Sequence, residues 1–154
     1  MDVISRRHLI RSGLQIAAGM LLLPPRFVSG GLFPQFFFSQ IKYRGGEWDP
    51  NPYFVEAMVE ELELRTSIDA SRERRTVILS DRDLFFSPFL TIAGKYEFDP
   101  FSAQERENLK RFLTHGGFLF AEDTMGTRGF GFDRAFRREM KALLPGTELK
   151  RLPQ

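Results

Sequence analysis

The stretch Gly-Gly-Phe-Leu-Phe-Ala-Glu-Asp at residues 116–123 decides the fold class that this sequence predicts. Its apolar centre does not alternate with polar residues, which is typical of a strand buried on both faces, as in a parallel sheet. A second such stretch, Phe-Leu-Thr-Ile-Ala-Gly, occupies residues 89–94. Between the two, Ser102 and Glu105 have the spacing of a capping box, which begins a helix that ends at Gly116. Strands interleaved with helices predict one doubly wound α/β domain, a mainly parallel sheet with helices on both faces.

Further helices and strands are expected on either side of this centre. Asn51 is placed to cap a helix whose first residue is Pro52, and Asp133 is placed to cap a last helix that Pro145 closes. The chain holds 17 phenylalanines, and those at residues 36–38 and 85–86 are expected to lie in buried sheet. The other predicted strands are residues 36–43, 66–70, 76–79 and one that begins within 149–152.

The composition of the 154 residues excludes several kinds of site. The chain has no cysteine, which excludes disulfides, a thiol nucleophile, iron–sulfur clusters and a cysteine-ligated zinc site. Its two histidines, His8 and His115, leave little for a histidine-based metal site. Residues 31–154 carry 18 Lys and Arg against 19 Asp and Glu, so the body of the chain offers no general attraction for nucleic acid.

Residues 1–30 have the order of features expected of an export leader. The stretch Ser5-Arg6-Arg7-His8-Leu9-Ile10-Arg11 resembles the twin-arginine (Tat) signal, with Leu9 where that family usually has Phe. The uncharged run that follows, residues 12–25, would form a helix only about 21 Å long, too short for a hydrocarbon core of about 30 Å. The small residues at 28–30 resemble a weak cleavage site. An amphipathic N-terminal helix that stays attached is the alternative interpretation.

The resemblance to a Tat signal implies a partner and a location. The partner is the Tat translocase, which usually carries proteins that have already folded. The expected location is the periplasm or the outer face of the membrane, with the chain attached to the membrane if the leader is not cleaved.

The body, residues 31–154, also resembles a known family. Residues 38–43, 84–94, 116–123 and 136–140 are similar, in order, to motifs of DUF4159, a domain of unknown function. The resemblance covers residues 36–153 and implies a flavodoxin-like fold of the class I glutamine-amidotransferase type, in exported or membrane-associated bacterial proteins. Amidotransferase chemistry does not carry over, because it needs a cysteine nucleophile.

Two departures from the DUF4159 pattern matter. The family often has Gly-His after its third strand, where this sequence has Gly94-Lys95. Family members also continue beyond the Leu-Pro that matches Leu152 and Pro153. We therefore expect a sheet that is truncated at its C-terminus and lacks a last strand and helix.

Candidate ligand-binding residues follow from the fold, because ligands of open α/β sheets collect beyond the carboxyl ends of the strands. A carboxylate there can ligate a divalent cation, bind sugar hydroxyls or act as a general base, or it can simply accept backbone hydrogen bonds. Neighbouring strand residues point to opposite faces, so only one of two adjacent carboxylates should enter a given pocket. The candidates are Tyr43, Trp48, Gly94, Lys95, Glu122, Asp123 and Arg128.

Three of these candidates have competing interpretations. Arg128 lies in the glycine-rich loop 126–132, which matches neither the dinucleotide nor the P-loop pattern and would form either a lid or a plain surface loop. The aromatic pair Tyr43 and Trp48 would either stack on a sugar ring or pack in the core.

Three functions remain open at this point. The leading hypothesis is a non-catalytic domain of the bacterial cell envelope that binds a carbohydrate ligand or a protein partner. The second is a carboxylate- or metal-dependent hydrolase of envelope carbohydrate that uses Glu122 or Asp123. The third is a structural subunit of a membrane complex that contacts its partners through phenylalanines. Catalysis is disfavoured because no serine elbow accompanies His115 and no cysteine is present.

Overall fold

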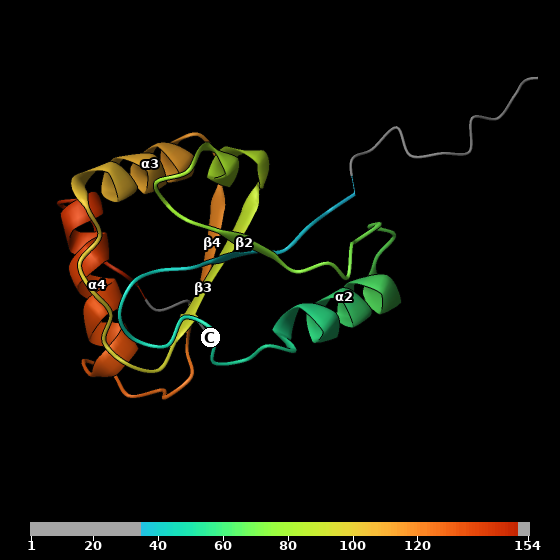
Figure 1. The fold of residues 1–154 in the computed structure, drawn as a ribbon, viewed down its shortest axis with the longest axis horizontal. Coiled ribbons are helices and arrows are strands. Elements are labelled where there is room, and N and C mark those ends of the chain that lie inside the picture. Colours follow the sequence, from blue (N-terminus) through green and yellow to red (C-terminus); the bar gives the residue numbers. More distant parts are fainter. Residues whose placement is uncertain (1–34, 151–154) are drawn as a thin grey trace, which may run out of the picture. The chain divides into compact units, whose positions relative to one another are not determined.

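The computed structural model describes residues 35–150, in which strands and helices alternate (Figure 1). The predicted leader at residues 1–30 lies outside the described residues. Within residues 35–150, no helix is both long and apolar enough to cross a membrane. In chain order the elements are strand β1 (Ser39–Ile41), helix α2 (Phe54–Arg65), strand β2 (Arg75–Val77), the 3-10 helix η1 (Arg82–Phe86), strand β3 (Phe89–Gly94), helix α3 (Ala103–Thr114), strand β4 (Phe118–Asp123) and helix α4 (Gly131–Leu143).

The four strands form one sheet in the order β2-β1-β3-β4, and every neighbouring pair is parallel. This is the order of the first four strands of a flavodoxin-like sheet, so the prediction of a doubly wound α/β fold is confirmed. The pairing of β3 with β4 runs from Phe89 opposite Phe118 to Gly94 opposite Asp123, which aligns the carboxyl ends of these strands.

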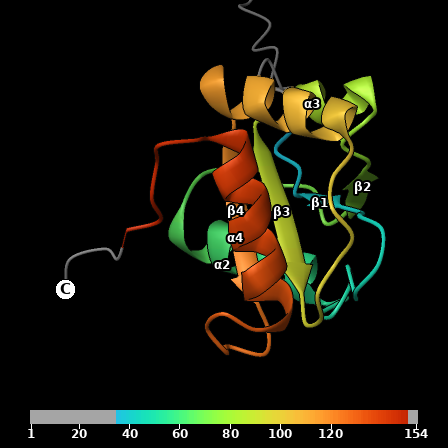
Figure 2. The same ribbon diagram turned by 90° about the vertical axis from the view of Figure 1, so that its left-hand side faces the viewer.

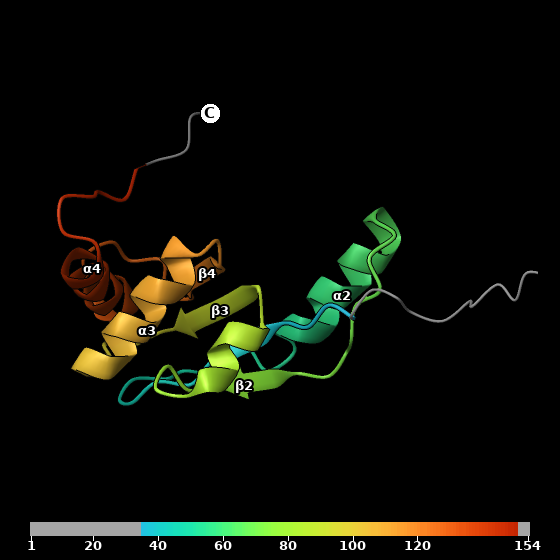
Figure 3. The same ribbon diagram turned by 90° about the horizontal axis from the view of Figure 1, so that it is seen from above.

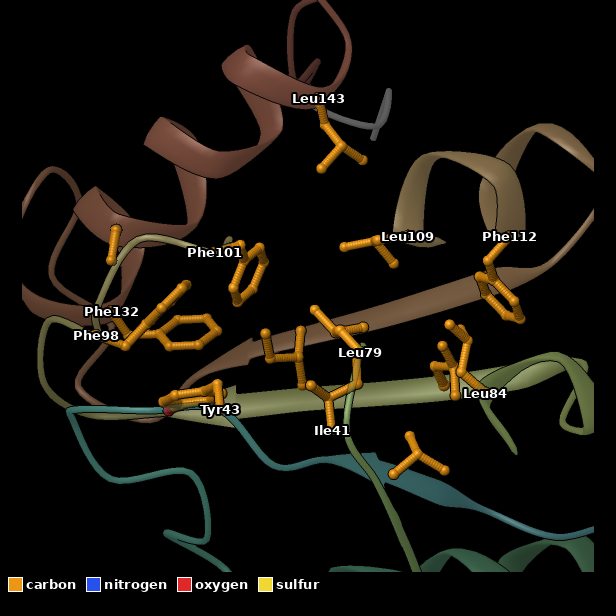
Figure 4. Packing of buried hydrophobic residues seen from close by; sticks show 14 residues of the cluster. Ile41, Tyr43, Leu79, Leu84, Phe98, Phe101, Leu109, Phe112, Phe132 and Leu143 are labelled. Carbon is orange, nitrogen blue, oxygen red and sulfur yellow. The ribbon is translucent and has the colours of Figure 1, made fainter. Parts of the chain in front are cut away.

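Helices cover both faces of the sheet, α2 on one face and α3 with α4 on the other (Figures 2 and 3). Two apolar clusters lie on the two faces, because successive strand residues point to opposite faces, and β3 contributes Phe89 to one cluster and Leu90 and Ile92 to the other. Phe38 packs with Val55 and Val59 of α2. Ile41 and Leu109 belong to the larger cluster beneath α3 and α4, which Figure 4 shows from close by.

The ends of α3 confirm the helix that the sequence predicts. The Ser102 hydroxyl accepts from the backbone N–H of Glu105, and the Glu105 carboxylate accepts from the backbone N–H of Ser102. Gly116 follows with a φ of 92°, a left-handed conformation that favours glycine. The chain therefore turns sharply from α3 into β4.

The predicted start points of α2 and α4 are wrong by a few residues. Tyr53, rather than Asn51, precedes the first turn of α2, and no side chain caps that helix. Phe130 precedes α4, and Asp133 lies inside the first turn, where its carboxylate accepts from the backbone N–H of Gly129 at 2.6 Å. Several polar residues near a helix start can serve as caps, so local sequence alone does not select one.

The predicted strand at residues 66–70 is also wrong. Residues 66–69 are exposed and have no apolar face to bury, and only Ala70 forms an isolated bridge, with Phe36. Of the strand predicted to begin within 149–152, residues 149 and 150 are not in a strand, and residues 151–154 lie outside the described part.

Phe85 and Phe86 do not lie in buried sheet as predicted. They close η1, where their exposed fractions are 42% and 79%, while Leu84 in the same turn is fully buried. A helix with three residues per turn buries about one residue in three. Leu84 takes that position, so both aromatic rings are left in solvent.

Candidate functional site

The carboxyl ends of β1, β3 and β4 meet at one edge of the sheet, because the three strands are parallel neighbours. At this edge Glu122 and Asp123 point to opposite faces, as strand alternation requires. Glu122 lines a pocket on the α2 face. Asp123 lines a cleft on the face that α4 covers. Two separate sites therefore exist at the strand ends.

The pocket on the α2 face is a closed polar cluster. Gln40 of β1 and Thr91 of β3 are both buried, and the Thr91 hydroxyl donates to the Gln40 side-chain oxygen at 2.7 Å. The Gln40 side-chain nitrogen donates to the Trp48 carbonyl oxygen at 3.0 Å. The free volume beside Glu122 is about 10 Å³, which is room for about one water molecule. A sugar ring does not fit there.

The cleft on the α4 face is open and much larger, about 440 Å³. It lies between the end of β4, the first turn of α4 and the segment that follows α4. Such a volume is within the range of small-molecule sites, which hold about 300–1,000 Å³. The residues that line the cleft are Asp123, Gly126, Arg128, Asp133, Arg137, Leu149 and Lys150.

Both carboxylates of the cleft already accept hydrogen bonds from other groups of the protein. Asp123 accepts from the backbone N–H of Met125 at 3.0 Å, which supports the turn after β4. Asp133 forms an ion pair with Arg137, with 2.8 Å between Oδ2 and Nε. The hydrogen bonds from Arg137 and from the Gly129 N–H, together with the nearby charge of Arg128, lower the pKa of Asp133, although burial opposes them.

Two cations of the cleft have no ion-pair partner within the described residues. Arg128 and Lys150 form no ion pair with any residue of the described range 35–150. Asp133 and Arg137 neutralise each other, so Arg128 and Lys150 outnumber the remaining carboxylate, Asp123. The charge of the cleft therefore suits a ligand that carries an anionic group.

Tyr43 and Gly94, two of the predicted ligand-binding residues, belong to the core. Tyr43 is 6% exposed and lies in the larger cluster (Figure 4). Its hydroxyl lies 2.8 Å from the carbonyl oxygens of both Ala93 and Glu47, which share its single hydrogen. A Cβ atom on Gly94 would overlap this hydroxyl and the Phe132 ring. Gly94 thus makes room for Tyr43, and burial together with the Glu47 carboxylate raises the pKa of the Tyr43 hydroxyl.

Trp48 and Lys95 also have local partners. Lys42 Nζ lies 5.3 Å and Arg74 Cζ 5.4 Å from the centre of the Trp48 ring, which is half-buried against the larger cluster. These cation–π contacts occupy the ring surface that a sugar would need. Lys95 is exposed, with its Nζ 5.5 Å from the ring of Tyr96.

Sequence reasoning missed several polar residues of these two sites. Gln40 and Thr91 are polar residues within otherwise apolar strands, and that contrast could have marked them as a buried pair. Asp133 and Arg137 have the (i, i+4) spacing of a helical ion pair, which is also legible in the sequence. Lys150 gave no local signal, because only the tertiary fold brings it to the cleft.

The described residues hold no cluster of metal-binding side chains. Within residues 35–150, no three His, Asp or Glu side chains are grouped so that they could hold a metal ion. The divalent cation considered from the sequence stays an untested prediction.

A comparison with protein families identifies the same family that the sequence motifs resemble. The family model of DUF4159, a domain of unknown function, matches residues 37–154. The chain belongs to the DUF4159 family. The curated proteins yield no match to this DUF4159 chain. The family match includes every element from β1 to α4, and therefore both the closed pocket and the open cleft.

Proposed function

We propose that this DUF4159 protein is an exported binding domain of the bacterial cell envelope, which holds its ligand without transforming it. The observation that carries the proposal is the cleft of about 440 Å³ at the end of β4, where Arg128 and Lys150 have no ion-pair partner within residues 35–150. Its charge favours a ligand with a carboxylate or phosphate group, such as an acidic envelope sugar. The Tat leader at residues 1–30 and the glutamine-amidotransferase-like type of fold are part of this proposal.

The arrangement of the described side chains supports binding over hydrolysis. Asp123 and Glu122 point to opposite faces, so they cannot serve as an acid–base pair at one site. His115 lies after α3, at the other end of the sheet from the cleft, with its Nδ1 2.7 Å from the Arg111 carbonyl oxygen. A hydrolase would have to use Asp123 alone, while that carboxylate also holds the Met125 N–H.

The test is ligand-dependent thermal stability of the full chain. The panel contains acidic and neutral sugars, sugar phosphates and divalent cations, measured on the parent, on Arg128→Ser and on Arg82→Ser. Arg82 is the matched control, an exposed arginine in η1 at the opposite end of the sheet. A ligand at a hundredfold excess over its Kd stabilises the folded state by about 2.7 kcal/mol.

We expect an acidic sugar to raise the melting temperature of the parent and of Arg82→Ser, but not that of Arg128→Ser. A shift that both variants keep would place the ligand outside the cleft. Breakdown of the bound sugar would favour the hydrolase. No shift with any compound would count against a small ligand in this cleft.

Export has its own test. Arg6→Lys combined with Arg7→Lys should leave the protein in the cytoplasm, whereas Arg26→Lys, outside the twin-arginine motif, should not change its location. Cell fractionation followed by immunoblotting measures both. If the parent and the double variant are found in the same cell fractions, the proposed export by the Tat route is wrong.

A further inference from the structure

Three exposed phenylalanines lie at the end of the sheet opposite the cleft. Phe85 and Phe86 close η1 just before β3 begins, and Phe118 is the first residue of β4. Their exposed fractions are 42%, 79% and 56%. The Phe118 N–H donates to the Pro88 carbonyl oxygen at 2.9 Å, which joins the two chain segments. We call these three phenylalanines the aromatic end.

The aromatic end continues into a shallow hollow beside the first described residue. Gln35, Phe36, Phe37 and Phe86 line this hollow of about 150 Å³. The chain therefore enters the domain next to Phe86, the most exposed of its large apolar side chains within residues 35–150. Large exposed apolar patches mark sites of protein or membrane contact.

The segment that precedes Gln35 indicates which of these contacts applies. The uncharged run at residues 12–25 ends ten residues before Gln35, and ten extended residues span at most about 36 Å. A leader that is retained in a membrane would therefore keep the aromatic end close to the bilayer. The short link also raises the local concentration of the aromatic end at the lipid surface.

The charged side chains of this region suit the bilayer interface. Arg111 lies with its Cζ 5.3 Å from the Phe85 ring, and Arg75 lies with its Cζ 3.4 Å from the Phe37 ring. Both guanidinium groups can contact lipid phosphates while the rings enter the interface. The exposed carboxylates of Glu73 and Asp83, next to Phe86, offset these cations, so the contact depends on aromatic burial more than on lipid charge.

We propose that the aromatic end is a membrane-contact surface, with Phe86 inserted into the interface of the lipid bilayer. The inference rests on the proposed export, with the leader retained. A short apolar leader and an interfacial aromatic patch are together the two weak anchors that stable attachment requires. The aromatic end lies where β3 and β4 begin and the cleft lies where β4 ends, so a membrane that contacts Phe86 would leave the cleft free for envelope ligands.

The full chain without cysteine allows a direct test. Phe86→Cys and Phe130→Cys are each labelled with a polarity-sensitive fluorophore and mixed with vesicles of equimolar phosphatidylethanolamine and phosphatidylglycerol. Phe130 is the matched control, a phenylalanine that is 54% exposed beside α4 at the cleft end. We expect a blue shift and quenching by brominated lipid chains at position 86, and neither effect at position 130.

Unlabelled variants give a second readout. Phe86→Ser should lower co-sedimentation of the full chain with the same vesicles about tenfold, which corresponds to about 1.4 kcal/mol, and Phe130→Ser should not lower it. The proposal is overturned if position 86 stays unquenched, as it would if a protein partner covers the aromatic end. Equal responses at positions 86 and 130 would overturn it too. Export is measured separately by the Arg6 and Arg7 variants, so failure of either proposal is recognisable.

Discussion

Replacement of Glu139 by glutamine tests the polar contact that joins α3 to α4. Glu139 of α4 is completely buried, and its carboxylate accepts from Arg106 Nε of α3 at 2.9 Å and from Arg138 Nε at 2.8 Å. The backbone N–H of Phe101 donates to the same carboxylate at 3.3 Å. Glutamine keeps the size of the side chain but removes the charge, and it replaces one acceptor oxygen by an NH2 donor, so one of the two arginine Nε–H groups loses its acceptor.

The magnitude follows from the burial of the three side chains. Removing one partner of a buried ion pair costs about 3–5 kcal/mol. The side chains of Arg106 and Arg138 are each 35% exposed, so water can solvate part of their charge after the substitution. We therefore expect Glu139→Gln to lower the free energy of unfolding by about 2–3 kcal/mol.

Urea unfolding, followed by circular dichroism and by the fluorescence of Trp48, measures this loss. Glu107→Gln is the matched control, because Glu107 is exposed on α3 and has no ion pair within the described range 35–150. The control should change the free energy of unfolding by less than about 0.5 kcal/mol. If Glu139→Gln unfolds at the same urea concentration as Glu107→Gln, the buried carboxylate does not stabilise the helix pair and the reasoning fails.

Three further outcomes are expected. Burial alone would raise the pKa of Glu139, but hydrogen bonds from Arg106 and Arg138 hold it below its usual value. The ionised Glu139 carboxylate therefore stabilises the fold above about pH 4.3, and this stabilisation is lost as the pH falls through the lowered pKa. The urea midpoint of Glu139→Gln should therefore depend less on acid pH than that of the parent. Tyr43→Phe should cost about 1 kcal/mol of unfolding free energy near neutral pH. In the parent, stability should fall above about pH 10, because the tyrosine of the unfolded chain ionises there while the buried one stays protonated. Tyr43→Phe should remove this fall, and urea titrations of both proteins at alkaline pH would show whether the fall is shared. Gly94→Ala should cost about 1–3 kcal/mol because its Cβ overlaps the Tyr43 hydroxyl, and an unchanged melting temperature would contradict this packing.

The sequence predicted the parts of the fold that depend on local pattern. Continuous apolar runs identified β3 and β4, and the spacing of Ser102 and Glu105 identified the start of α3. Positions that depend on several competing local groups were predicted less well. The start of α4 is an example, because Asp133 can cap a helix or pair with Arg137, and tertiary packing decides between them.

The candidate site was predictable only in outline. The rule for strand ends predicted Asp123 as a candidate, because it follows from the parallel topology alone, and Asp123 lines the cleft together with Arg128 of the glycine-rich loop. It could not exclude Tyr43 and Gly94, since the Tyr43 hydroxyl occupies the space beside Gly94, and the two residues lie far apart in the sequence. Lys150 could not be predicted from the local sequence either, because its place beside the cleft that Asp123 lines depends on the path of the chain after α4.

The central position of β1 has a consequence for the timing of synthesis. Gln40 of β1 contacts Thr91 of β3, which lies 51 residues further along the chain, so the middle of the sheet closes only after β3 has left the ribosome. The proposed leader emerges first, long before the domain behind it has folded. A route that carries folded proteins must therefore wait for the sheet to close. Variants that slow this closure should accumulate as precursor in the cytoplasm even though their leader is intact.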